Sequence, residues 1–178
     1  MTEAEWLACK EPELLRQFVC ARTSDRKRLL RMVACCRYAR QIRNQRFRAA
    51  VETAERYGDV LATGEDGDFA ECLSTLMKTD PILMGPHYKA DHPRFVQMIR
   101  DIFGNPFRPV AADPAWLTST VVALARGIYD DRAFDRMPIL ADALQDAGCD
   151  NDDVLGHCRG PGPHVRGCWV VDLVLGKA

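Results

Sequence analysis

The 178-residue chain lacks any segment that would direct it to a membrane. Residues 1–10 include Glu3 and Glu5 and have no basic stretch followed by an apolar one, so they do not look like a signal peptide. No apolar run approaches the roughly 18 residues that a membrane span needs, and Asp172 interrupts the apolar C-terminus. We therefore expect a cytoplasmic protein with no membrane partner.

The chain also lacks a large net charge and a biased composition. Its formal net charge is −1, with 47% hydrophobic and 28% charged residues. These values are typical of an ordinary globular protein, and the length fits one domain that can bury its own core. We predict a single α-helical domain over residues 1–178, in which residues 62–93 form a variable loop region.

Recognisable catalytic motifs are missing as well. The sequence contains no Gly-x-Ser-x-Gly, no His-Glu-x-x-His and no phosphate-binding P-loop. Asp150-Asn-Asp152 looks like the start of a calcium-binding loop, but the twelfth position holds Pro161 where that loop needs glutamate. These absences favour a non-catalytic protein-binding or regulatory module over an enzyme.

What the sequence does contain is a succession of helical patterns. Thr2 with Glu5 is a capping box, and residues 47–61 carry the clearest stripe of apolar side chains at helical spacing. Residues 165–175 are ambiguous, because their valines favour a strand. A lone strand would have no pairing partner, so we predict a helix there. The fold class is therefore all-α, an irregular multi-helix bundle with a Gly/Pro-rich loop before the C-terminal segment.

Two helix starts in the second half are marked by proline. Asp113 followed by Pro114 predicts the start of a helix that buries Leu117, because proline is favoured at the first helical position. Pro138 predicts another start, for a helix that buries Ile139.

Charge is segregated although it nearly cancels. Residues 22–48 contain ten Lys/Arg and one acid, whereas residues 130–153 contain eight aspartates and two arginines. One hypothesis is a nucleic-acid-binding protein that uses a basic helix over 22–48, through Arg37, Arg40 and Arg43. No known nucleic-acid-reading motif accompanies these arginines. The competing interpretation is that they lie on a solvated face or pair with acidic residues.

Eight cysteines are many for this length, and without signs of secretion we expect them to be reduced. The densest chemistry lies in residues 149–172. Two histidines and three cysteines there are candidate zinc ligands, since zinc takes such side chains tetrahedrally: Cys149, His157, Cys158, His164 and Cys168. A structural zinc site near the C-terminus is the cofactor hypothesis. The alternative is that the cysteines are small core residues.

Two other hypotheses concern the same segment. A polar group around the Gly/Pro-rich loop, made of Arg159, His164, Arg166 and Asp172, could bind an anion. A Cys/His pair within 149–172 could instead form the active site of a small enzyme, because such pairs meet in space and not in sequence.

Seven segments carry a resemblance to a known family, among them Val33–Arg37, Asp113–Leu117, Ile128–Arg136 and Ile139–Leu144. The other three are the most specific. They are Met1–Cys9 (MTEAEWLAC), Arg100–Pro109 (RDIFGNPFRP) and His157–Asp172 (HCRGPGPHVRGCWVVD). Together they make the chain similar to a widespread planctomycete protein family over almost its whole length. The resemblance implies a bacterial cytoplasmic protein built as one domain. It implies no activity, so no catalytic residue is carried over.

Overall fold

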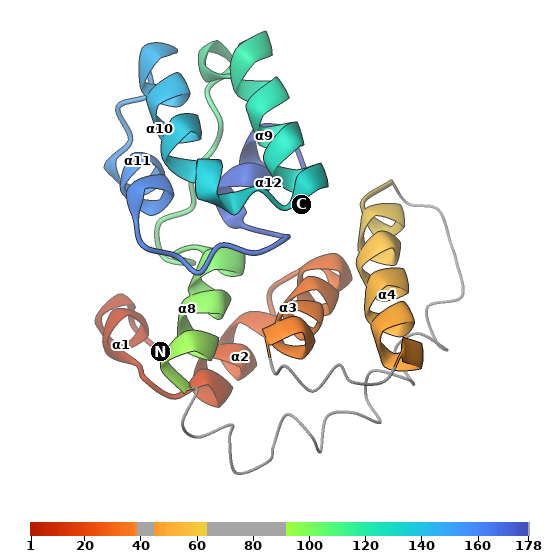
Figure 1. The fold of residues 1–178 in the computed structure, drawn as a ribbon. Coiled ribbons are helices and arrows are strands. Elements are labelled where there is room, and N and C mark those ends of the chain that lie inside the picture. Colours follow the sequence, from red (N-terminus) through yellow and green to blue (C-terminus); the bar gives the residue numbers. More distant parts are fainter. Residues whose placement is uncertain (39–44, 64–91, 178) are drawn as a thin grey trace. The chain divides into compact units, whose positions relative to one another are not determined.

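The structure is a computed structural model that describes residues 1–38, 45–63 and 92–177. Within these ranges the regular elements are all helical, with no strand (Figure 1). The all-α prediction is therefore confirmed. The predicted loop region 62–93 lies outside the described residues, except for its ends, which belong to helices. No helix of the described ranges is long and apolar enough to cross a bilayer.

The chain divides into two compact units, Met1–Ile99 and Arg100–Ala178. Helix α8 (His92–Phe103) runs across this division. The expected single domain over 1–178 stays a prediction, and each unit is described by itself.

The first unit contains four helices before α8 among its described residues: α1 (Glu3–Ala8), α2 (Pro12–Cys20), α3 (Asp25–Tyr38) and α4 (Gln45–Thr63). The predicted capping box is present, since Thr2 Oγ1 accepts the Glu5 N–H and Glu5 accepts the Thr2 N–H. The described residues of the basic segment 22–48 contribute to α3 and to the start of α4, and residues 39–44 lie outside the described ranges.

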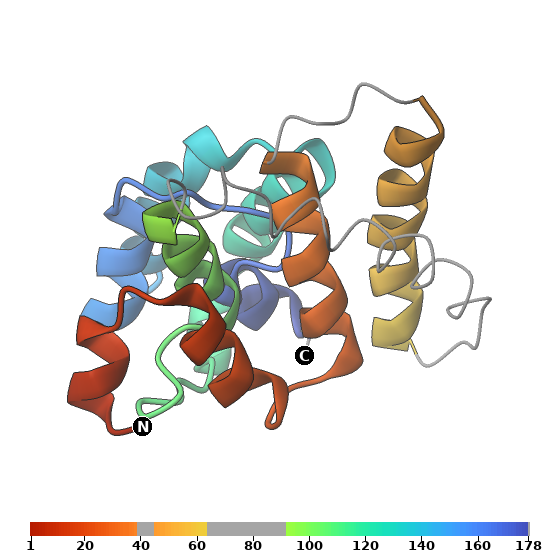
Figure 2. The same ribbon diagram turned by 90° about the horizontal axis from the view of Figure 1, so that it is seen from below.

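Helices α3 and α4 lie side by side in both ribbon views (Figures 1 and 2). Their approach is close at Gly58, where an added Cβ would come within 3.2 Å of Leu30. An ion pair links the two helices, with Arg37 Nη2 at 2.6 Å from Glu55 Oε2. The Glu55 side chain is only 2% exposed and the Arg37 side chain 32% exposed, so the carboxylate of this pair is withdrawn from water.

The second unit builds its core from the helices that follow α8. These are α9 (Ser119–Asp131), α10 (Met137–Asp146), α11 (Asp152–Arg159) and α12 (Trp169–Leu175), with short 3₁₀ turns η1 (Pro114–Trp116) and η2 (Phe134–Arg136). Helix α9 packs against α10 and α12, and α10 packs against α11. The predicted C-terminal helix is thus confirmed as α12, which ends at Gly176 in the left-handed conformation.

Two expectations about the second unit were wrong in detail. Asp113 does cap a turn, but the turn is η1, and helix α9 begins only at Ser119 with Thr118 as its cap. Leu117 falls between the two elements and is 37% exposed. Ile139 is exposed too, because the buried face of α10 is set by its neighbours Leu140 and Leu144.

Candidate metal centre

Four side chains of the second unit converge on one point. One ligand atom from each of Asp101, His157, His164 and Cys168 lies within 4.8 Å of the other three. Asp101 and Cys168 are buried, and the His164 and His157 side chains are 7% and 19% exposed. This cluster of carboxylate, imidazole and thiol groups is the kind of donor set that can hold a transition-metal ion.

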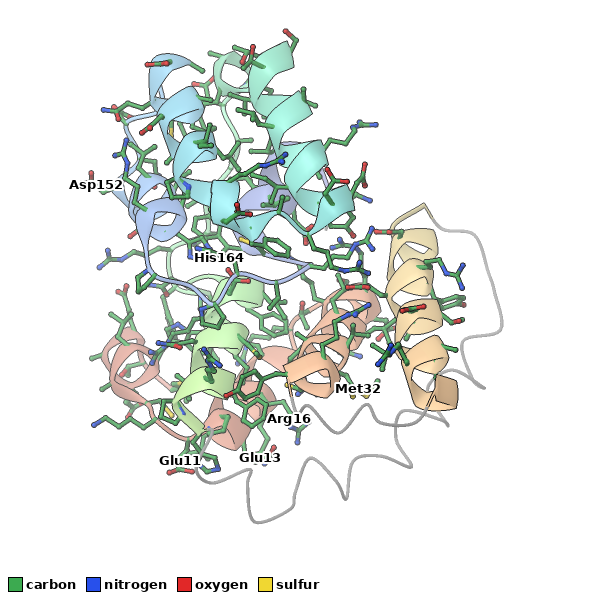
Figure 3. The ribbon with its side chains drawn as sticks, viewed as in Figure 1. Glu11, Glu13, Arg16, Met32, Asp152 and His164 are labelled. Carbon is green, nitrogen blue, oxygen red and sulfur yellow. The ribbon has the colours of Figure 1, made fainter. Side chains whose placement is uncertain are left out.

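The four ligands come from separate parts of the unit. Asp101 lies in the last turn of α8, His157 near the end of α11, and Cys168 is the N-cap residue of α12. His164 belongs to the loop between α11 and α12 and lies beside the end of α8 (Figure 3). An ion at this point would therefore join segments that are more than fifty residues apart in sequence.

Asp101 is at the centre of the cluster. Its Oδ1 atom is 3.0 Å from His157 Nε2 and 2.7 Å from His164 Nδ1. Its Oδ2 atom accepts the backbone N–H of Val165 at 2.8 Å. Burial alone would raise the pKa of Asp101, but the hydrogen bonds from His157 and His164 hold this pKa below its ordinary value. The carboxylate is thus held in its charged form, which is the form that binds a metal.

The thiol of Cys168 completes the cluster, with its Sγ atom 3.2 Å from His157 Nε2. Burial and the nearby Asp101 carboxylate raise the pKa of Cys168 well above its ordinary value. The same two causes raise the pKa of Cys158 to about 12. Without a cation beside it, Cys168 is therefore a protonated, unreactive thiol, since a nucleophilic cysteine needs exposure and a lowered pKa.

The geometry is also wrong for a Cys–His–Asp catalytic arrangement. In such a triad the base uses one ring nitrogen for the nucleophile and the other for the orienting carboxylate. Here the same atom, His157 Nε2, contacts both Cys168 Sγ and Asp101 Oδ1. Because one nitrogen faces both the thiol and the carboxylate, the ring cannot relay a proton between them as the two nitrogens of a triad do.

We expect thiol labelling to show this lack of reactivity. In the folded protein at neutral pH, Cys149, Cys158 and Cys168 are expected to react with iodoacetamide far more slowly than the partly exposed Cys9 and Cys20. Mass spectrometry of peptides from a labelling time course gives the rate at each site. Fast labelling of Cys168 would contradict this assignment and favour the Cys/His enzyme.

Trp169 closes the cluster on the side of His157, with 5.2 Å between the two ring centroids. The indole lies directly over Gly104, where an added Cβ would be 3.1 Å from the Trp169 ring. Gly104 also has φ +62°, which an L side chain adopts only with strain. Both facts make glycine the residue that fits beside the cluster.

Replacing Gly104 by Ala is therefore expected to lower the free energy of unfolding by about 2 kcal/mol, from backbone strain together with overpacking. Gly148→Ala is the matched control, because Gly148 has φ +89° but nothing within 4 Å of an added Cβ. Urea unfolding of both variants separates the two costs. Equal losses would mean that the contact with Trp169 contributes nothing.

Of the five zinc ligands predicted from the sequence, the structure brings together His157, His164 and Cys168. Cys149 and Cys158 instead lie in the apolar core of the unit and are not in the cluster. Spacing alone could not distinguish these cysteines, because all of them fit a buried face.

Asp101 was missed by the sequence analysis. It lies three residues after Met98 and next to Ile102, so the helical period places it beside the buried stripe of α8. A charged residue at such a position is a signal for a buried polar site, because an unpaired buried charge is costly. The partners of that charge could not have been found in this way.

The residues of the predicted anion-binding group do not meet at one site, because each has contacts with different residues. Arg159 Nη2 lies 2.8 Å from Asp142 Oδ1 on α10 and also bonds Gln145. Arg166 stacks over the Tyr129 ring at 4.3 Å, and Asp172 is buried within α12. His164, the fourth member, belongs to the metal cluster.

Of the three arginines predicted to bind nucleic acid, the structure describes only Arg37. Arg37 is engaged with Glu55 inside the first unit, so its charge is already matched. Arg40 and Arg43 lie outside the described residues.

No protein-family model, curated protein or solved structure matches the chain. The resemblance to a planctomycete family stays a prediction. The conclusions about function therefore rest on the chemistry of the cluster.

Proposed function

We propose that the chain is a non-catalytic protein-binding or regulatory module whose second unit is organised by a structural zinc ion. The observation that carries this proposal is the convergence of Asp101, His157, His164 and Cys168. The cytoplasmic location and the planctomycete family remain part of the same proposal.

Hydrogen bonding alone is a poor explanation of this convergence. A ring nitrogen carries at most one proton, yet His157 Nε2 is within 3.2 Å of both an oxygen and a sulfur. His164 Nε2 is buried and has no hydrogen-bond partner among the described residues, and the printed hydrogen bond of this ring is that of Nδ1 with Asp101 Oδ1. A cation at the common point would satisfy all four donors at once.

The donor chemistry supports zinc. Thiolate and imidazole ligands suit zinc and its neighbours among the transition metals, whereas magnesium and calcium prefer sites made wholly of oxygen. A structural role is favoured over a catalytic one because structural zinc sites carry four protein ligands, whereas catalytic sites leave one position open. The low exposure of all four side chains supports the same conclusion.

Elemental analysis of protein purified without an affinity metal column or chelator tests the proposal. We expect one zinc per chain in the unmodified protein and much less in Cys168→Ala. Cys158→Ala is the matched control and should retain the full amount, because Cys158 is as buried as Cys168 but lies outside the cluster. Sub-stoichiometric metal in the unmodified protein would reject the proposal.

A further inference from the structure

Asp101 differs from the other three ligands in making contacts with both of its terminal atoms. Oδ1 faces the two histidines, while Oδ2 accepts the N–H of Val165 at 2.8 Å. A carboxylate can bind a metal through one oxygen or through both. With Oδ2 engaged by the backbone, only Oδ1 is directed at the common point of the cluster.

The charges of the four groups add to a simple total. A carboxylate and a thiolate each contribute one negative charge, and two neutral imidazoles contribute none. A divalent ion therefore makes the centre neutral, whereas a monovalent or trivalent ion would leave a net charge. Net charge is costly where Asp101 is 2% and Cys168 0% exposed.

The donor spacing is close to that of tetrahedral coordination, although the printed contacts are somewhat shorter. At zinc bond lengths of about 2.0 Å to oxygen and nitrogen and about 2.3 Å to sulfur, tetrahedral donors lie roughly 3.3–3.6 Å apart. The observed contacts within the cluster range from 2.7 to 3.2 Å, and all four atoms lie within 4.8 Å of one another. Each of these hydrogen-bond distances is a few tenths of an ångström shorter than a tetrahedral edge, so the donors would move slightly apart to surround one ion.

From these observations we infer that Asp101 binds a divalent ion through Oδ1 alone, completing a closed, electrically neutral, four-coordinate site while Oδ2 fixes the loop at Val165. The inference rests on the proposed zinc function and deepens it, because it assigns a role to each oxygen of Asp101 and a neutral charge to the occupied site. A closed site has no position for a metal-bound water, so the centre has no hydrolytic nucleophile. The carboxylate also ties ion binding to the position of the loop that carries His164.

X-ray absorption at the zinc edge tests the coordination in the unmodified full chain, without relying on any variant. We expect four ligands, one of them sulfur and three of them oxygen or nitrogen. Five or six ligands, or a shell without sulfur, would overturn the inference. Absence of bound zinc would instead overturn the proposed function, so the two failures are distinguishable.

Cobalt(II) replacement then tests Asp101 itself. We expect the unmodified protein with cobalt to show the intense visible bands of tetrahedral coordination and a near-ultraviolet thiolate band. Asp101→Asn keeps an oxygen that can accept the Val165 N–H but removes the charge. It is expected to keep the thiolate band, lose the tetrahedral intensity, and bind the ion at least about 100-fold more weakly, beyond the loss typical of a residue that only supports a ligand.

Cys168→Ser is the complementary variant, and its cobalt spectrum is expected to lose the thiolate band.

Amide hydrogen exchange at Val165 tests the role of Asp101 Oδ2, which accepts this N–H. We expect the protection of the Val165 amide to survive in Asp101→Asn and to be lost in Asp101→Ala. Unchanged cobalt spectra and affinity in Asp101→Asn would show that Asp101 is not a ligand. If that variant fails to fold, the ligand count from X-ray absorption in the unmodified protein decides.

Discussion

Removal of zinc by a chelator is expected to lower the free energy of unfolding of the second unit by several kcal/mol. A ligand that binds only the folded state at a thousandfold excess over its Kd contributes about 4 kcal/mol. For a unit of this size each kcal/mol corresponds to about 4–8 °C in Tm. We therefore expect the Tm to fall by at least about 15 °C on chelation, measured by calorimetry or by circular dichroism.

The effect has a physical origin in the separation of the ligands. The ion would fasten the end of α8 to α11, to the loop at His164 and to the start of α12, so its loss frees all three segments from one another. Trp169 is a local reporter, since its ring lies beside that of His157. We expect its fluorescence to change with chelation and to return when zinc is added back.

Matched cysteine variants separate loss of the ion from loss of packing. Cys168→Ala and Cys158→Ala each remove a fully buried sulfur, so each carries a similar cavity cost. Only Cys168→Ala removes a ligand, and its Tm is expected to be insensitive to chelator. Cys158→Ala should start from a lowered Tm and still show the full response. Equal responses in the two variants would contradict the assignment of Cys168.

The second large effect is expected in the first unit, at the ion pair between α3 and α4. Arg37→Met would remove the cation that lies 2.6 Å from the buried Glu55 carboxylate, and removing one partner of a buried pair typically costs about 3–5 kcal/mol. Since Arg37 itself is one-third exposed, we expect a loss near 3 kcal/mol. Urea unfolding, followed by circular dichroism, measures it.

Two controls define what this loss means. Arg28→Met removes a partner of Asp25 on the surface, where both side chains are exposed, and should cost less than about 1 kcal/mol. Replacing Arg37 by Met and Glu55 by Leu together removes the buried charge and should recover most of the stability. A loss in Arg37→Met no larger than in Arg28→Met would show that the pair is solvated.

Local rules were sufficient for much of the fold. The capping box at Thr2 depends only on residues within one turn of each other, and the structure contains it as predicted. The same local rules were wrong at Leu117, because Asp113 and Pro114 start a 3₁₀ turn whose continuation is decided by the competing cap at Thr118.

The candidate site could be predicted only in part. Residues 149–172 were singled out because histidine and cysteine are concentrated there, and three of the five expected ligands meet in the cluster. Cys168 belongs to the cluster and Cys158 does not, because their side chains point in different directions from α11 and from the start of α12. The spacing of the cysteines along the sequence does not specify these directions.

The sequence by itself determined the helical class, several helix ends and the segment that holds most of the metal-binding chemistry. These properties follow from interactions between residues close along the chain. Only the tertiary structure decided that Asp101, more than fifty residues before His157, is the centre of the site. That contact arises because burial of the Asp101 carboxylate required two imidazoles and a backbone N–H to meet it.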